Sequence, residues 1–230
     1  NETERKKLIN DFASVARREG KASPVGLALA RKGLADPDMW LRQAAFRYIC
    51  ENALADPDHA GALMRTLEAE TDEPMKRRMR KYVKEAVEAL VPQNTPEQQL
   101  RQFVTASPCP PVTEAALLRL RRAGGTRTIA QHEKDLSALY AQCKTPEKRA
   151  WLVAAVEDAY SDRPFKKMRE AFYRKALGDR DEAVRAAAVV GMLDFVREFG
   201  EDSRKLEAVA GRITDPALKA RTRQKLELWA

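Results

Sequence analysis

The sequence has few glycines, cysteines and histidines, and it has no long run of apolar residues. Its apolar runs are only a few residues long, so no segment is predicted to span a bilayer. Alternation of polar residues with β-branched or aromatic ones is not sustained anywhere, which predicts essentially no sheet. Ten glycines in 230 residues, together with many Ala, Leu, Glu, Lys and Arg, favour helices instead. The sequence therefore predicts an all-α protein.

Residues for metal binding or nucleophilic catalysis are also scarce. The two histidines, His59 and His132, each lack a neighbouring Cys or His, so we expect them on solvated helix starts and predict no metal site. A serine-nucleophile elbow and a phosphate-binding loop are absent. Of the three cysteines, Cys50 and Cys143 are expected to be buried, and Cys109, in the loop SPCPP, to be exposed. We predict no catalytic residue and no cofactor.

The charge of the chain is positive. With 42 Lys and Arg against 34 Asp and Glu, the net charge is +8, which favours a nucleic acid or an acidic protein as partner. Both signs are interleaved, as on an ordinary soluble helical protein. The chain begins with Asn1 rather than Met and is therefore interpreted as a processed or trimmed product. We favour a cytoplasmic location and leave open a secreted or periplasmic one after removal of a signal peptide.

Helix start signals recur along the chain at a regular interval. Residues that can cap a helix N-terminus follow one another every 34 to 38 residues, at Asp36, Asp72, Ser107, Thr145, Asp179 and Asp215. Pro follows directly in four of the six units, where it suits a first helical turn. Six residues after the cap, four units carry an arginine, at Arg42, Arg78, Arg185 and Arg221. These caps and arginines are predicted to be structural, and Arg78 is expected to pair with the cap aspartate of its own or the neighbouring unit.

The best unit, Asp36-Pro37 with Leu41, Arg42 and Ala45, resembles the turn and second-helix start of a HEAT repeat. The resemblance implies a right-handed α-solenoid of about six HEAT-like, armadillo-like helical hairpins. It would form one domain over residues 1–230, with an N-terminal capping helix at 1–22. First helices are predicted at 24–34, 58–70, 96–106, 130–143, 164–177 and 202–213. A hinge is predicted near 107–130, because SPCPP and AGGT interrupt the helical pattern there.

Two basic clusters, KRRMRK at 76–81 and RLRRAGGTR at 119–127, belong to consecutive second helices. The resemblance implies that second helices line the concave face of the solenoid. The cluster residues that could contact phosphates or an acidic peptide are Lys76, Arg77, Arg80, Arg119, Arg122 and Arg127. The alternative is that they pair with acidic residues of their own surface. Trp151 stands where four other units place Arg, and it is either a binding anchor or a side chain packed between repeats.

The resemblance implies a non-catalytic binding or scaffold module that holds a protein partner on its concave face, and the basic surface favours an acidic segment. The alternative is a nucleic-acid-binding HEAT-like protein, including the HEAT-like DNA glycosylases for alkylated bases. That family uses a catalytic Asp in the groove. One turn after Trp40 and Trp151 the chain has Ala44 and Ala155, and Asp158 lies two turns after Trp151. The identity of a partner and the oligomeric state are not predicted.

Overall fold

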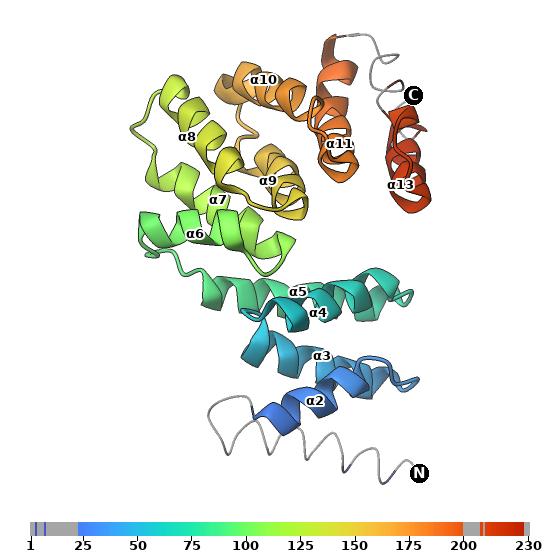
Figure 1. The fold of residues 1–230 in the computed structure, drawn as a ribbon. Helices are drawn as coiled ribbons and strands as arrows, with labels where there is room; N and C mark the ends of the chain where they lie inside the picture. Colours follow the sequence, from blue (N-terminus) through green and yellow to red (C-terminus); the bar gives the residue numbers. More distant parts are fainter. Residues whose placement is uncertain (1–2, 4–6, 8–22, 200–207, 209, 228–230) are drawn as a thin grey trace. The chain divides into compact units, whose positions relative to one another are not determined.

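A computed structural model describes residues 3, 7, 23–199, 208 and 210–227 of the chain. Every regular element in these residues is helical, which confirms the predicted all-α class (Figure 1). The predicted capping helix 1–22 and most of the predicted helix 202–213 lie outside the described residues. None of the described helices combines the length and the apolar character that crossing a bilayer requires. The chain divides into two compact units, Asn1–Gln93 and Asn94–Ala230.

From residue 23 onward, the first unit contains two helical hairpins. Its helices are α2 (Pro24–Gly33), α3 (Met39–Ala53), α4 (Pro57–Ala69) and α5 (Glu73–Leu90). Helix α2 packs on α3, and α3 and α4 both pack on α5, so the second helices of the two hairpins lie side by side (Figure 1). Each helix begins where a side-chain oxygen accepts hydrogen bonds from free backbone N–H groups, at Ser23, Asp38, Asp56 and Asp72. The largest fully buried side chains of this unit are Phe46, Ile49, Leu63, Met75 and Met79.

The second unit arranges those of its helices that the structure describes in two layers. They are α6 (Glu97–Ala106), α7 (Pro110–Ala123), α8 (Ile129–Gln142), α9 (Pro146–Ala159), the 3-10 turn η1 (Arg163–Phe165), α10 (Lys166–Ala176), α11 (Glu182–Phe199) and α13 (Pro216–Glu227). Helices α7, α9, α11 and α13 pack in succession, and α6, α8 and α10 follow one another in the other layer (Figure 1). Within this unit the second helices of successive hairpins therefore form one continuous row.

In three of the six second helices, the N-cap in the structure differs from the predicted one. Asp72, Thr145 and Asp215 are caps as predicted, whereas α3, α7 and α11 begin after Asp38, Cys109 and Asp181. The predicted caps Asp36, Ser107 and Asp179 lie two residues earlier, and each accepts the N–H of the true cap residue. The turn before the helix thus has its own side-chain acceptor, a local motif typical of Asp and Ser. The corrected caps follow one another every 34 to 37 residues.

Two further expectations were wrong because Cys109 and His132 are packed inside the second unit. Cys109 is only 1% exposed, and burial raises the pKa of its thiol to about 11. His132 is buried edge-on against the rings of Tyr160 and Phe165, and burial lowers its pKa. Pro110 does not break a helix but begins α7, where its missing N–H is not needed. The boundary between the two units, at Gln93–Asn94, precedes the segment in which a hinge was predicted.

Candidate functional site

A basic residue stands four positions after the true cap in five of the six second helices, at Arg42, Lys76, Arg149, Arg185 and Lys219. Arg42 Nη1 donates to the carbonyl oxygens of Asp36 and Pro37, each at 3.0 Å, and Arg185 Nη1 donates to that of Asp179 at 2.8 Å. Lys76 Nζ reaches the carbonyl of Glu70 at 3.0 Å in the same way. These cations hold the turn before their own helix. Lys76, predicted as a ligand contact, therefore has a structural partner.

Two of these arginines also tie one hairpin to the next. Arg42 Nη2 lies 3.1 Å from Glu70 Oε2, and Arg149 Nε lies 2.9 Å from Asp179 Oδ2. The two acids occupy the same place, two residues before the next cap. Burial alone would raise the pKa of Asp179, but hydrogen bonds from Arg149 and from the Tyr140 hydroxyl outweigh it and lower this pKa to about 2. Arg42, one of the predicted structural arginines, thus pairs with Glu70, whereas Arg149, which pairs with Asp179, was not among them.

Arg78 lies two positions beyond this structural place and is exposed on α5. Its guanidinium carbon lies 5.6 Å from the centre of the Trp40 ring, and its Nη1 is 3.5 Å from Gln43 Oε1. Trp40 is 54% exposed, so the indole and the guanidinium form an open stacked pair. The expectation that Arg78 pairs with a cap aspartate is therefore wrong. The backbone of Arg221 lies in α13, but its side chain is outside the described part of the chain.

The stacked pair continues into a row of contacts between α3 and α5. Gln43 Nε2 donates to the Tyr82 hydroxyl at 2.7 Å, and the guanidinium of Arg47 lies 5.6 Å from the centre of the Tyr82 ring. Trp40, Gln43 and Arg47 are spaced three and four residues apart, so they share one face of α3. We call Trp40, Gln43, Arg47, Arg78 and Tyr82 the α3–α5 surface. Helical spacing alone could have indicated it, but counting six residues from the cap Asp72 assigned Arg78 to the structural positions of the repeat.

The α3–α5 surface lies in a positive environment. Helix α5 carries six basic and three acidic residues. Arg77 and Arg80 are exposed, and neither has an ion pair or a hydrogen bond from its side chain to another described residue. Lys81 and Lys84 have only exposed partners on their own helix, Glu85 at 3.7 Å and Glu88 at 4.0 Å. Such exposed pairs are weak, so these cations can be recruited by a partner.

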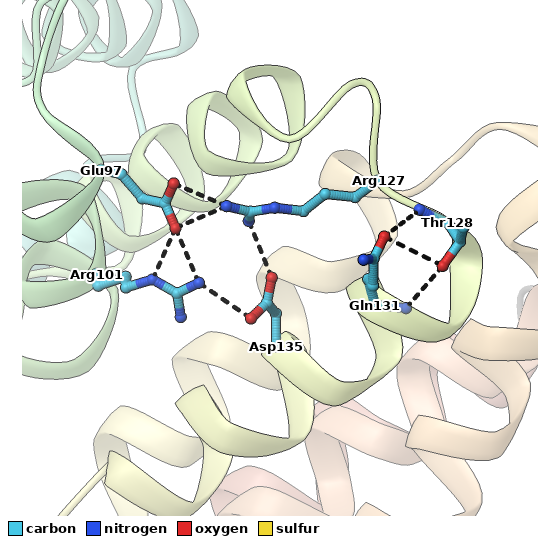
Figure 2. Close-up of polar contacts among 6 residues, drawn as sticks. All are labelled: Glu97, Arg101, Arg127, Thr128, Gln131 and Asp135. Carbon is cyan, nitrogen blue, oxygen red and sulfur yellow. Dashed lines mark hydrogen bonds and ion pairs between the residues drawn. The ribbon is translucent and has the colours of Figure 1, made fainter.

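Arg127, predicted as a contact for phosphates, belongs to an ion network in the second unit (Figure 2). Its Nη2 lies 2.7 Å from Glu97 Oε2, and its Nη1 lies 2.9 Å from Asp135 Oδ2. Arg101 contacts the same two carboxylates, so two cations balance two anions and connect α6, α8 and the loop before α8. Beside it, Thr128 and Gln131 form the capping box of α8. This arrangement fixes the loop and leaves no excess charge.

The remaining predicted contacts of the second unit are divided between surface and interior. Arg122 is exposed at the end of α7, whereas Arg119 is half-buried. The Nη1 of Arg119 is buried without a hydrogen-bond partner in the described residues. Trp151 is half-buried, and the Lys148 ammonium lies 3.9 Å from the centre of its ring. Lys148 also donates to the carbonyl of Ser107, so Trp151 is covered by a side chain that is itself held in place.

Asp158, which shares the face of α9 with Trp151, lies beside a second carboxyl group. Burial raises the pKa of Glu114 on α7, and the nearby Asp158 raises it further. Among the described residues, no three His, Cys, Asp or Glu side chains gather as metal ligands would. A search among protein-family models, curated proteins and solved structures finds no match to this chain.

Proposed function

We propose that this chain is a non-catalytic binding module that holds an acidic segment of a protein partner on the α3–α5 surface. The observation that carries the proposal is the open Trp40 ring stacked by Arg78. Trp, Tyr and Arg are the residue types that contribute most binding energy at protein interfaces, and this surface presents all three. The row of contacts from Gln43 to Tyr82 orients these side chains before a partner arrives, which lowers the entropic cost of binding.

An acidic partner follows from the charge around this surface. Arg78 has no carboxylate partner among the described residues, and the nearby Arg77 and Arg80 have none either. A guanidinium binds a carboxylate through two parallel hydrogen bonds, which lysine cannot do. A carboxylate on the partner can therefore bind Arg78 while an adjacent apolar group covers the Trp40 ring.

Selection from a displayed library of random peptides tests the proposal, because it finds ligands even when the natural partner is unidentified. The selected peptides are expected to be enriched in Asp and Glu. Trp40→Ala and Arg78→Ala are each expected to weaken binding of a selected peptide at least tenfold, about 1.4 kcal/mol, in fluorescence polarisation. Arg65→Ala is the matched control, because it removes the same charge from an exposed position of α4 in the same unit. Equal losses in all three variants, or no enrichment of acids, would refute the proposal.

A nucleic acid is the second candidate partner, favoured by the exposed row Arg77, Arg80, Lys81 and Lys84 on α5. Binding to duplex DNA over a salt series separates the two, since each phosphate contact steepens the loss of affinity with salt. Under this alternative Arg77→Ala would weaken binding and reduce the slope, and Trp40→Ala would not.

Glycosylase activity would rest on Trp151 and Asp158. Release of the base from alkylated duplex DNA, with Asp158→Asn as control, measures this activity directly.

We also propose that the hairpins form a right-handed, HEAT-like α-solenoid. Support comes from the regular interval of the caps and from the cation that follows five of them at the same position. Within each unit, second helices pack on second helices, as solenoids require. Small-angle X-ray scattering tests the arrangement of the whole chain. A compact globule of this length would have a radius of gyration of about 17 Å. Six hairpins stacked at about 10 Å intervals predict at least about 20 Å, and the smaller value would contradict the proposal.

A further inference from the structure

A pocket of about 410 Å³ lies between the C-terminal halves of α3 and α5, on the same side as Tyr82. Its wall on α5 consists of Tyr82, Ala86, Ala89 and Leu90, and α3 and the turn after it contribute Ala53 and Leu54. The alanines leave the space open because they have no side chain beyond Cβ. Tyr82 belongs both to the pocket and to the α3–α5 surface, so the two are continuous.

The rim of this pocket is polar but electrically balanced. Glu51 and Glu85 stand at the rim. The Nε of Arg47 lies 2.6 Å from Glu51 Oε1, and Lys81 lies 3.7 Å from Glu85. The hydrogen bond that Arg47 donates to Glu51 and the charges of Glu51 and Glu85 raise the pKa of Arg47, so this guanidinium interacts with both carboxylates. Two cations thus offset two anions at the rim. The pocket therefore favours an uncharged apolar group over a charged side chain or a metal ion.

From this lining and this charge balance, we infer that the pocket binds an uncharged apolar side chain, of leucine or phenylalanine type, from the same acidic segment that binds the α3–α5 surface. This inference rests on the proposed function, which it extends by naming a second determinant of the partner. Apolar area removed from water in the pocket contributes affinity, while the carboxylates of the segment at Arg78 contribute orientation.

The geometry of the helices sets the distance between the two determinants. The pocket residues of α5 follow Arg78 by up to twelve positions, and Glu51 follows Trp40 on α3 by eleven. At 1.5 Å per residue the pocket is centred roughly 10–16 Å along the helices from the stacked pair. The partner segment must therefore place its apolar residue at about this distance from its acidic residue.

Titration with N-acetyl-phenylalaninamide tests the pocket alone, because this probe has no charge. In protein with ¹³C-labelled Ala and Leu methyl groups, we expect the largest shifts at Ala86, Ala89 and Leu90. Leu29 on α2 is 48% exposed and serves as the internal control for unspecific apolar binding. Ala89 is exposed, so Ala89→Phe fills the pocket without entering the core. This variant is expected to abolish the shifts, and Ala171→Phe, at an exposed position of α10, is expected to preserve them. Shifts at Leu29 as large as those in the pocket, or unchanged binding to Ala89→Phe, would overturn the inference.

The same peptide library distinguishes failure of this inference from failure of the proposed function. Selection on the Ala89→Phe protein is expected to retain the enrichment of acids and to lose that of the apolar residue. Selection on the Trp40→Ala protein is expected to lose the acids, while titration of this variant with N-acetyl-phenylalaninamide gives the shifts of the unaltered protein. Acid enrichment with no apolar preference in the unaltered protein would refute the pocket and leave the proposed function standing.

Discussion

Asp179→Ala is expected to lower the free energy of unfolding by about 3 kcal/mol. The side chain of Asp179 is only 9% exposed and joins α9 to the turn before α11, because Arg149 and Tyr140 both donate to it. Its pKa falls from 3.8 to about 2 in the folded chain, which alone corresponds to about 2 kcal/mol of stability at neutral pH. Truncation adds the cost of leaving the Arg149 guanidinium, 16% exposed, without its carboxylate.

The pH dependence follows from the direction of this shift. A carboxyl group whose pKa is lowered by folding stabilises the fold above its unfolded pKa, and this contribution is lost as the pH falls towards the folded pKa. The contribution of Asp179 is therefore complete above pH 4 and decreases between about pH 4 and pH 2. Urea unfolding of the unaltered chain and of Asp179→Asn over this pH range measures this contribution. The free energy of unfolding of the variant should change less with pH than that of the unaltered chain.

Asp162→Ala provides the matched control in the same unit. Asp162 also pairs with an arginine, Arg121, but its side chain is 56% exposed. Exposed pairs contribute about 0–1 kcal/mol, so the free energy of unfolding of this variant should be close to that of the unaltered chain. Equal destabilisation by Asp162→Ala and Asp179→Ala would show that burial of the Asp179 pair is not the cause of its effect.

The all-α class and the approximate positions of the helices could be predicted from helix periodicity and cap chemistry, since both are local. Helix boundaries agreed to within a few residues, for example 96–106 against Glu97–Ala106 for α6. The exact cap could not be predicted where two acceptors stand two residues apart, as in Asp36-Pro37-Asp38, because either aspartate can accept the same kind of hydrogen bond.

That two-residue uncertainty had a direct effect on the predicted site. The misplaced caps Asp36 and Asp179 set the structural cation at six residues after the cap. Counted from the true cap Asp72, this offset selected Arg78 instead of Lys76, which stands at the structural place four residues after the cap. Lys76 holds a backbone turn, and Arg78 is free to stack on Trp40. Contacts between helices, such as the ion pair of Arg127 with Glu97 thirty positions earlier, leave no local signal. The burial of Cys109 and His132 was missed for the same reason.

Two helical glycines are expected to respond oppositely to the same change. A Cβ on Gly61 in α4 would meet only the flexible end of Arg65, at 3.4 Å, so Gly61→Ala should stabilise the chain by up to about 1 kcal/mol through helix propensity. A Cβ on Gly191 in α11 would lie 2.5 Å from the ring of Tyr173, which is fully buried in α10. Gly191→Ala should therefore destabilise the chain by about 1–3 kcal/mol despite the same gain in propensity. Thermal and urea unfolding of both variants measure whether each change raises or lowers the free energy of unfolding.

A double variant identifies the cause of the Gly191 effect. Tyr173→Leu alone should destabilise the chain, because it removes buried ring atoms. The double variant with Gly191→Ala should lose less free energy of unfolding than the sum of the two single variants, since the smaller side chain leaves room for the new methyl group. Strict additivity would mean that Gly191 is required for a reason other than its contact with Tyr173. In that case the close contact between Gly191 and the Tyr173 ring would not explain the destabilisation by Gly191→Ala. Other buried residues between α10 and α11 would have to explain it.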